Sequence, residues 1–519
     1  MSTVGGAEGR VTPHGERYSA GGLSGSGKSD TVSSEFRPVI PGFYPDPTVC
    51  RVGDDYYLAT SSFEYFPGAP LFHSRDLVSW VQVGNILTTP EQFVRGAGLP
   101  SAGIYGSTLR HHGGRFWFVT TNMDHLDAGQ LLVTSVDPIG QWSEPVHIPD
   151  AVGIDPDLAW DGDGTCLLTW NAINFRGSQA IMQAPLDLAS GNLLGEPYPV
   201  WQGSGMAAAE GPHLYSIGGW WYLVLAEGGT ERGHAVTVAR SRAARGPFEG
   251  YAGNPLLTRR SSGHPVQNVG HADLVQTDDG SWAAVYLGVR ARGSSPGFHV
   301  LGRETFLAGV QWAEGWPRLV PGAFDVPPAS TSFIDPFDGD LHPRWVSPAG
   351  DPSRIAQHRP GGGLRFLAEA IGSDDLVCAR VRDLQWAATA DIYGCGRFVL
   401  RLDDRHWYAL HVDRTRVRAH VRIGDITSEL GSVDFVGPVV TLEIESVAPA
   451  ARTVPFGRAG PDEIVLSVIA SGKKTPLARM DGRYLSTEVA SGFTGRVLGV
   501  GGLGQNSSVL AVHYRAGAV

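Results

Sequence analysis

A short pattern recurs five times between about residue 38 and residue 322: a turn rich in Gly and Asp, followed by an aromatic or apolar strand. The copies are VGDDYYLATSS from Val52, HGGRFWFVTTN from His112, DGDGTCLLTWN from Asp161, IGGWWYLVLAE from Ile217 and DDGSWAAVYLG from Asp278. Their matching positions, Asp55, Arg115, Thr165, Trp220 and Ser281, are 60, 50, 55 and 61 residues apart. Repeats of this length built from strands and turns are typical of propeller blades, and a sandwich would not give such even spacing. The sequence therefore predicts an all-β fold with a five-bladed β-propeller.

Composition agrees with many short strands joined by turns. Of 519 residues, 69 are Gly and 35 are Pro, while 42% are hydrophobic and only 18% are charged. These proportions exclude a disordered chain and a coiled coil. The net charge of −11 speaks against a nucleic-acid partner, and the sequence contains no apolar stretch long enough to suggest a membrane span. The N-terminus shows no signal peptide, so we expect a cytoplasmic protein, and both a monomer and a homo-oligomer remain open.

A second unit follows the repeats. Residues 323–332 are rich in Pro and Ser and are interpreted as a linker between a catalytic unit at 37–322 and a second domain at 333–519. Runs such as RFVLRL, WYALHV and RVRAHVRI alternate apolar and polar residues, which is the period of half-buried strands. The sequence therefore predicts a C-terminal β-sandwich. Two of the four cysteines, Cys378 and Cys395, lie on separate predicted strands, where buried thiols are expected and a disulfide is left open.

Residues 22–29, GLSGSGKS, satisfy the letters of a phosphate-binding loop. Such a loop needs a strand before it and a helix after it, so that backbone N–H groups face the phosphates. Neither flank here has that character, and we interpret residues 1–36 as a flexible Gly/Ser-rich leader.

Polar residues stand at equivalent places upstream of the repeats. Eight to ten residues before each matching position lie Asp46, Ser107, Asp155, Glu210 and His271. In a propeller the innermost strands run along a central channel, so residues at their starts converge at one mouth of it. The repeat register thus predicts that three carboxylates and a histidine meet in one funnel.

The chemistry that suits such a cluster is glycoside hydrolysis. One carboxylic acid protonates the leaving oxygen, one carboxylate activates water, and a third carboxylate raises the pKa of the acid by repulsion. Each acid could instead cap a turn, and the cluster could hold a metal or bind sugar hydroxyls without cleaving them. Aromatic residues near the first two repeats could form walls for a sugar ring or belong to the blade core: Phe63, Tyr65, Phe66 and Tyr105.

The segment RPVIPGFYPDPTVCRVGDDYYLATSSFEYFPGAPLFHSRDLVSW resembles the opening of glycoside hydrolase family 43, especially its β-xylosidase and α-L-arabinofuranosidase branch. EGPHLY, AEGGTERGHAVTVARS, VGHADLV and LGRETFLAGVQWAEGWP continue the resemblance in order over residues 37–322. The resemblance implies a five-bladed propeller with an inverting mechanism. In this branch a β-sandwich of the concanavalin-like jelly-roll type follows the propeller.

The resemblance also implies roles for single residues. Asp46 in PDP resembles the general base, Glu210 in EGPHLY the general acid, and Asp155 in IDPDL the acid that tunes and orients Glu210. His271 in GHADLV resembles a residue that helps to hold a central ion, commonly calcium, through water. The implied sugar-binding residues are Phe63, Tyr105, Thr230, Arg290 and, in a loop of the second domain, Phe493.

Some substrate-facing positions depart from the family pattern. Gly106-Ser107-Thr108 replaces the usual Ala-Pro-Thr, and Tyr105 stands where many relatives carry Trp. We therefore expect an exo-acting, inverting hydrolase that releases single pentoses, first β-D-xylose, from xylo-oligosaccharides or arabinoxylan fragments. An α-L-arabinofuranosidase or a bifunctional enzyme is the alternative, and a carbohydrate-binding propeller without catalysis is the second.

Overall fold

The structure is a computed structural model that describes residues 34–96, 98–173, 179–449, 459–504 and 507–517. The segment GLSGSGKS lies outside the described residues, as does all but the end of the predicted leader. The chain is all-β, as the sequence predicts: antiparallel sheets make up nearly all of its regular structure.

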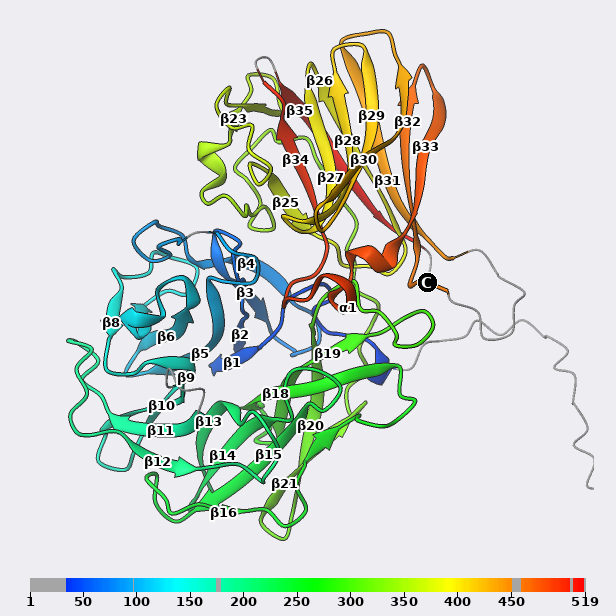
Figure 1. The fold of residues 1–519 in the computed structure, drawn as a ribbon. Helices are drawn as coiled ribbons and strands as arrows, with labels where there is room; N and C mark the ends of the chain where they lie inside the picture. The colour runs from blue at the N-terminus through cyan, green and yellow to red at the C-terminus, as the bar shows by residue number, and fades with distance from the viewer. Residues whose placement is uncertain (1–33, 97, 174–178, 450–458, 505–506, 518–519) are drawn as a thin grey trace, which may run out of the picture.

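Residues 48–321 form five sheets in chain order (Figure 1). The first contains β1 (Thr48–Val52), β2 (Asp55–Ala59), β3 (Gly68–Ser74) and β4 (Val81–Leu87). The second contains β5 (Ile104–His112), β6 (Arg115–Asn122), β7 (Gln130–Ser135) and β8 (Val146–Ile148). The third contains β9 (Gly153–Trp160), β10 (Cys166–Ile173), β11 (Gln179–Pro185) and β12 (Tyr198–Trp201). The fourth contains β13 (Glu210–Ile217), β14 (Trp220–Glu227), β15 (Ala235–Ser241), β16 (Glu249–Gly250) and β17 (Leu257–Thr258), and the fifth contains β18 (Val266–Gln276), β19 (Trp282–Arg290), β20 (Glu304–Ala313) and β21 (Trp316–Pro321).

The first strands of the five sheets close a ring. β1 contacts β5, β5 contacts β9, β9 contacts β13, β13 contacts β18, and β18 returns to β1. The segment before β1 joins the last sheet as well, because Ile40 and Thr305 exchange backbone hydrogen bonds. All five repeats therefore present their first strand to a common centre.

The repeat turns explain the hairpins between the first and second strands. Two of these turns are Gly113-Gly114 and Gly218-Gly219, and all four glycines have positive φ, between 59° and 78°. Two-residue turns that require positive φ at both positions match the twist of the flanking strands and favour Gly. Apolar residues of the strands pack between neighbouring sheets, as Phe118 does in the second sheet and Leu168 in the third.

Two larger sheets follow. One has eight strands, β22 (Phe333–Asp335), β23 (Ala356–His358), β24 (Leu364–Phe366), β26 (Trp386–Tyr393), β31 (Val439–Val447), β32 (Glu463–Ala470), β33 (Lys473–Asp481) and β35 (Ser508–Ala516). The other has six, β25 (Val377–Arg380), β27 (Gly396–Asp403), β28 (His406–Asp413), β29 (Arg416–Ile423), β30 (Ile426–Asp434) and β34 (Val497–Gly502). Side chains of both sheets share one apolar core, for example Leu442 and Ala388 from the first and Phe398 and Leu410 from the second.

In the part of the chain that the structure describes, helical structure is limited to short pieces. The 3-10 helices are η1 (Ser34–Phe36), η2 (Met123–Ala128), η3 (Pro352–Arg354) and η4 (Gly482–Leu485), and α1 (Thr487–Ala490) has a single turn. Within the described ranges, none of them has the length and apolar character that a membrane span requires. All four cysteines are free thiols, with Cys378 buried and Cys395 partly exposed.

The two parts of the chain share a buried contact. The guanidinium of Arg401 on β27 donates a hydrogen bond of 2.7 Å to the hydroxyl of Tyr65 and lies 3.5 Å from the carboxylate of Glu64. The sequence left open whether Tyr65 and Phe66 form a wall for a sugar ring or part of the blade core. In the structure Tyr65 is fully buried at this contact beside Phe43 and Leu376, and Phe66 is also buried. This contact brings the second part of the chain against the mouth of the ring.

Candidate active site

A cavity of about 140 Å³ opens where the first strands of the ring begin. Eight of the nine predicted site residues line it, together with a few neighbours: Asp46, Phe63, Tyr105, Gly106, Ile154, Asp155, Glu210, Gly229, Thr230, His271, Arg303 and Phe493. The exception is Arg290. Residues more than 440 positions apart in the chain therefore meet at one place.

Local breaks in strand pairing aim these side chains at the cavity. The register between first and second strand shifts at Glu210 in the fourth sheet, beside His271 in the fifth and next to Asp155 in the third. Asp46, Asp155 and His271 also have positive φ, of 53°, 55° and 49°. Bulges re-aim side chains next to active sites, and left-handed backbone at non-glycine residues costs roughly 1–3 kcal/mol each. The ring thus supports a strained backbone where its polar residues converge.

Asp46 is held as a carboxylate. Its side chain accepts a hydrogen bond of 2.6 Å from the Ser61 hydroxyl and one of 2.9 Å from the guanidinium of Arg303. Burial alone would raise the pKa of Asp46, but Arg303, His271 and Ser61 lower it by more, so the pKa lies below the ordinary value. An ionised Asp46 has the capacity to accept a proton.

Glu210 has the opposite environment. Burial raises its pKa, the neighbouring carboxylates of Asp155 and Asp46 raise it further, and the pKa reaches about 8. The pKa of Asp155 is also raised, mainly by burial, although its Oδ2 accepts a hydrogen bond of 3.0 Å from the Gly211 N–H. One cavity thus contains a carboxylate and a carboxylic acid near neutral pH, which is the usual sign of an acid and base pair.

The arginine of the site differs from the one predicted. The Arg303 guanidinium contacts both Asp46 and the Thr230 hydroxyl at 2.9 Å and lies over the rings of Phe63 and Phe493, with its Cζ 5.7 and 5.4 Å from the ring centroids. Arg290 instead forms a two-pronged ion pair with the buried Glu304, at 2.7 and 2.8 Å.

The prediction for Arg290 is therefore corrected to Arg303. Both arginines flank the loop between β19 and β20, and the carboxylate of Glu304 neutralises the first of them. In the sequence Arg303 directly precedes Glu304, in LGRETFL, and those letters alone do not show that Glu304 pairs with Arg290.

Three aromatic rings form one wall of the cavity. Phe63 stacks against Phe493 with the ring centroids 5.9 Å apart, and the ring of Tyr105 meets Phe63 edge-on at 5.4 Å. Phe493 belongs to the segment between α1 and β34, so the second part of the chain contributes directly to the cavity. Sequence reasoning missed Ser101, whose hydroxyl accepts a hydrogen bond from the Phe493 N–H and whose carbonyl accepts one from the Tyr105 hydroxyl.

His271 lies in the cavity wall, 3.7 Å from Asp46, and the described side chains around it offer a calcium ion few direct oxygen ligands. Calcium prefers six to eight oxygen ligands. The nearby carboxylates are Asp46, which is bonded to Ser61 and Arg303, and Asp155, which accepts from Gly211. Among the described residues, no three His, Cys, Asp or Glu side chains are arranged to hold a metal ion.

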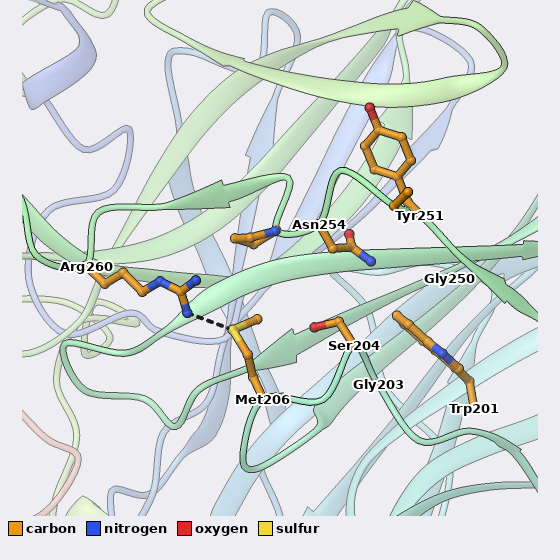
Figure 2. Close-up of a pocket in the computed structure, with 10 residues that line it drawn as sticks. Trp201, Gly203, Ser204, Met206, Gly250, Tyr251, Asn254 and Arg260 are labelled. Atoms are coloured by element: carbon orange, nitrogen blue, oxygen red, sulfur yellow. Dashed lines mark hydrogen bonds between the residues drawn. The ribbon is translucent and has the colours of Figure 1, made fainter.

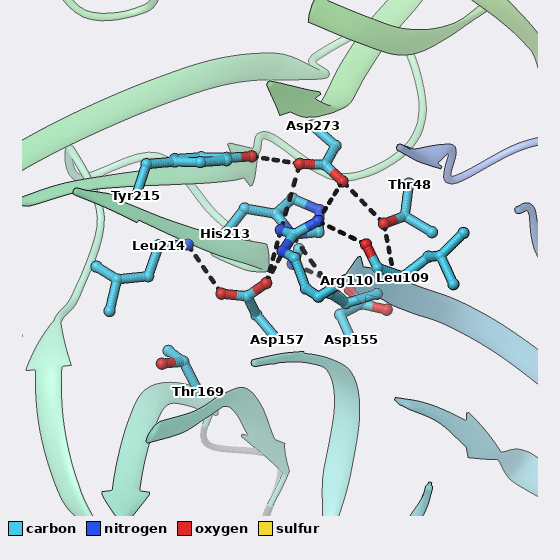
Figure 3. A network of polar contacts seen from close by, with 12 residues as sticks. Thr48, Leu109, Arg110, Asp155, Asp157, Thr169, His213, Leu214, Tyr215 and Asp273 are labelled. Carbon is cyan, nitrogen blue, oxygen red and sulfur yellow. Dashed lines mark hydrogen bonds and ion pairs between the residues drawn. The ribbon is translucent and has the colours of Figure 1, made fainter. Parts of the chain in front are cut away.

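A second polar cluster lies beneath the cavity, centred on Arg110 of β5 (Figure 3). Its guanidinium contacts Asp157 of β9 and Asp273 of β18, each at 2.8 Å, and both carboxylates are fully buried. His213 and Tyr215 of β13 complete the ring of contacts, with His213 Nδ1 3.1 Å from Arg110 and the Tyr215 hydroxyl donating to Asp273. This cluster includes side chains from every first strand, because Thr48 of β1 also donates to Asp273.

A larger cavity, of about 450 Å³, lies at the edge of the fourth sheet (Figure 2). Trp201, Met206, Tyr251, Asn254 and Arg260 contribute to its lining, which contains no carboxylate. The Asn254 amide is already bonded to the Val238 backbone, and the Tyr251 ring stacks on Trp316. Size alone therefore does not mark the reactive site, which is the smaller cavity with the carboxylates.

Comparison with known proteins agrees with this geometry. A xylosidase/arabinosidase of Butyrivibrio fibrisolvens is 44% identical over 296 residues, which are 55% of this chain and 56% of that protein. A non-reducing end α-L-arabinofuranosidase, BoGH43B, of Bacteroides ovatus is 42% identical over 54% of this chain and 53% of its own length. The chain thus spans about half the length of the curated relatives it matches.

Among solved structures, xylan β-1,4-xylosidase from Bacillus halodurans C-125 superposes with a TM-score of 0.81 at 29% identity, over 92% of this chain and 99% of that chain. The model of one family, glycosyl hydrolases family 43, matches residues 36–317, which is more than half of the sequence. This chain therefore belongs to glycosyl hydrolases family 43.

Proposed function

We propose that this protein is an exo-acting glycoside hydrolase that releases single pentoses from the non-reducing ends of xylo-oligosaccharides or arabinoxylan fragments by inversion. The observation that carries the proposal is that two carboxyl groups in one cavity have opposite protonation states near neutral pH. Asp46 has a pKa below its ordinary value, and Glu210 has a pKa of about 8. Hydrolysis with inversion needs this pair, a base for water and an acid for the leaving oxygen.

The contacts of each residue support these proposed roles. Asp46 acts as the general base, and Arg303 and Ser61 keep it ionised at the pH of the reaction. Glu210 donates its proton to the glycosidic oxygen. Asp155 keeps that proton on Glu210 by repulsion, which raises the pKa of the acid. Arg303 and Thr230 are placed to bind sugar hydroxyls.

The shape of the site supports an exo mode. A cavity of about 140 Å³ has the volume of about five water molecules at ~30 Å³ each, which suits one pentose ring better than a chain. Phe63, Tyr105 and Phe493 provide an apolar wall on one side of it. Because Phe493 comes from the second part of the chain, that part limits the space available for longer substrates.

The architecture belongs to the same proposal. The five sheets with contacting first strands are the blades of a five-bladed β-propeller, and the two larger sheets with a common apolar core are a β-sandwich of the jelly-roll type. The even repeat spacing in the sequence supports the first assignment. We take residues 37–322 as the catalytic domain, 323–332 as the linker and 333–519 as the sandwich.

β-D-Xylose is our first choice of sugar and α-L-arabinofuranose our second. The relatives named above include a xylosidase/arabinosidase and an α-L-arabinofuranosidase. The test is parallel hydrolysis of p-nitrophenyl β-D-xylopyranoside and p-nitrophenyl α-L-arabinofuranoside, with the anomer of the first product followed by proton NMR. We expect α-xylose as the initial product of the xyloside and a higher kcat/KM for the xyloside. An initial β-anomer would contradict inversion, and a higher kcat/KM for the arabinofuranoside would reverse the choice of sugar.

A non-catalytic carbohydrate-binding protein is the competing function. Asp46→Ala and Glu210→Ala should each lower kcat by ~10³-fold while binding of xylobiose, measured by calorimetry, persists. The matched control is Asp163→Ala, which changes an exposed turn carboxylate. If the unaltered protein binds xylo-oligosaccharides but turns over neither glycoside, the binding function replaces the catalytic one.

A further inference from the structure

The cluster beneath the cavity is centred on a cation that the chain itself supplies. Both terminal nitrogens of the Arg110 guanidinium are engaged: Nη1 donates to Asp273 and to the Leu109 carbonyl, and Nη2 contacts Asp157, His213 and Asp273. A guanidinium carries five N–H donors in a planar fork and stays protonated at all physiological pH values. It can therefore bind several strands at once as a permanent positive charge.

The carboxylates around Arg110 have little capacity left for a metal ion. Asp273 also accepts from the Thr48 hydroxyl at 2.8 Å and from the Val49 N–H at 2.9 Å. Asp157 accepts from the Leu214 N–H at 2.9 Å. Because these donors and the guanidinium occupy both side chains, a divalent cation would have to displace Arg110 to reach them. This agrees with the small number of direct oxygen ligands around His271 among the described residues.

The cluster lies directly behind the site residues. Thr48 follows Asp46 by two positions, Asp157 follows Asp155 by two, and Asp273 follows His271 by two. On the fourth sheet, His213 and Leu214 follow Glu210 by three and four positions. The contacts of the cluster therefore fix the first strands immediately behind the residues that line the cavity.

We propose that Arg110 replaces a central metal ion in this protein and is a positioning residue for Asp46, Asp155 and Glu210. Its guanidinium balances the inward-facing carboxylates of the third and fifth sheets and holds the five first strands together. The ring then needs no bound cation for its stability. Arg110 itself does not line the cavity, so it acts through the strands rather than on the substrate.

The first test measures metal content and thermal stability and does not depend on any enzymatic activity. Elemental analysis of the purified protein should find less than 0.1 equivalent of divalent metal, and neither EDTA nor calcium chloride should shift the Tm by more than about 1 °C. Stoichiometric metal, or a lower Tm in EDTA, would overturn the proposal.

The second test removes the guanidinium. Arg110→Ser leaves two buried carboxylates without their cation and should lower the Tm by roughly 5–10 °C, and added calcium should restore part of the loss because it can then bind between Asp157 and Asp273. Arg115→Ser is the matched control, since Arg115 is exposed on the same hairpin, and should leave the Tm unchanged. A Tm of Arg110→Ser that does not respond to calcium, or that equals the control, would contradict the proposal.

A third variant covers the case in which Arg110→Ser does not fold. Arg110→Lys keeps the charge but loses the fork, so it should fold with a smaller loss of Tm. In this variant kcat should fall ~10- to 100-fold with little change in KM, because the carboxylates shift while the sugar-binding wall does not. This last readout rests on the proposed glycosidase activity. Equal falls in binding and turnover would contradict a positioning role, whereas absence of activity in the unaltered protein would concern the proposed function alone.

Discussion

The hydroxyl of Ser101 accepts a hydrogen bond of 2.8 Å from the backbone N–H of Phe493, a residue 392 positions further along the chain. The carbonyl of Ser101 accepts from the Tyr105 hydroxyl, and its N–H donates to Glu64 at 3.0 Å. Glu64 in turn faces Arg401 of the second part of the chain. One serine therefore links two of the three aromatic rings of the cavity to the contact between the two parts.

Ser101→Ala should weaken substrate binding more than the chemical step. Loss of one hydrogen bond of about 1 kcal/mol frees the Phe493 loop and should raise KM about fivefold, with kcat within a factor of two. Steady-state kinetics on the preferred p-nitrophenyl glycoside measure both constants. Ser262→Ala, an exposed serine, is the control. An unchanged KM would mean that the position of Phe493 does not depend on Ser101.

The pH dependence should reflect the two opposed carboxyl groups. Glu210 must be protonated to act as the acid, so kcat/KM should fall as pH rises through about 8. Asp46 must be ionised, so the acidic limb should lie below the ordinary carboxylate range. Asp155→Asn removes a charge that raises the pKa of Glu210, and we expect its alkaline limb to move to lower pH. An alkaline limb that stays in place would contradict this role of Asp155.

The two arginines of the β19–β20 loop should behave differently. Arg303→Met removes the cation that lowers the pKa of Asp46 and should reduce kcat/KM by ~10²-fold or more and move the acidic limb upward. Arg290→Met leaves Glu304 buried without its partner, so it should lower the Tm strongly while the pH limbs of the remaining folded enzyme stay in place. The pH profile and Tm of both variants, measured side by side, check this prediction. Equal pH profiles for the Arg303→Met and Arg290→Met variants would show that Arg290 also acts in the site.

Glu210→Gln should stabilise the protein at alkaline pH. The pKa of Glu210 is higher in the folded state than in the unfolded state. Ionisation of Glu210 therefore lowers the free energy of unfolding, and this loss is absent below the unfolded pKa near 4.5 and grows until the pH passes about 8. The variant should therefore match the unaltered Tm at pH 5 and exceed it by roughly 2–5 °C at pH 9. Calorimetry at both pH values measures the difference. A gain of the same size at pH 5 and pH 9 would show that charge is not its cause.

The repeat register predicted most of the site because the spacing of the repeats can be counted directly in the sequence. Asp46, Asp155, Glu210 and His271 occupy matching repeat positions, Asp46 just before β1 and the others on β9, β13 and β18, so closing the ring brings them together. Arg303 was missed because it lies in a loop, where no period places a side chain. Its selection over Arg290 depends on Glu304, and that pairing is visible only in three dimensions.

Contacts between the two parts of the chain were less predictable. Arg401 and Glu64 are 337 positions apart, and no repeat relates them. Phe493 was found through a resemblance, but its anchor Ser101 was not, because a serine in a Gly-rich loop carries no signal for a partner so distant. The Arg110 cluster was also missed, since its members follow the repeat-matched residues by two to five positions and look like ordinary strand positions in the sequence.

Closure of the ring has a consequence for protein synthesis. Thr48 and Asp273 meet although they are 225 positions apart, and Asp46, in front of Thr48, precedes Glu210 by 164 positions and His271 by 225. A nascent chain on the ribosome therefore carries Asp46, the proposed base, long before β18, which closes the ring, has left the exit tunnel. Until β18 has emerged and come into contact with β1, Asp46 and Glu210 do not face one closed cavity, and the growing polypeptide lacks the complete candidate site.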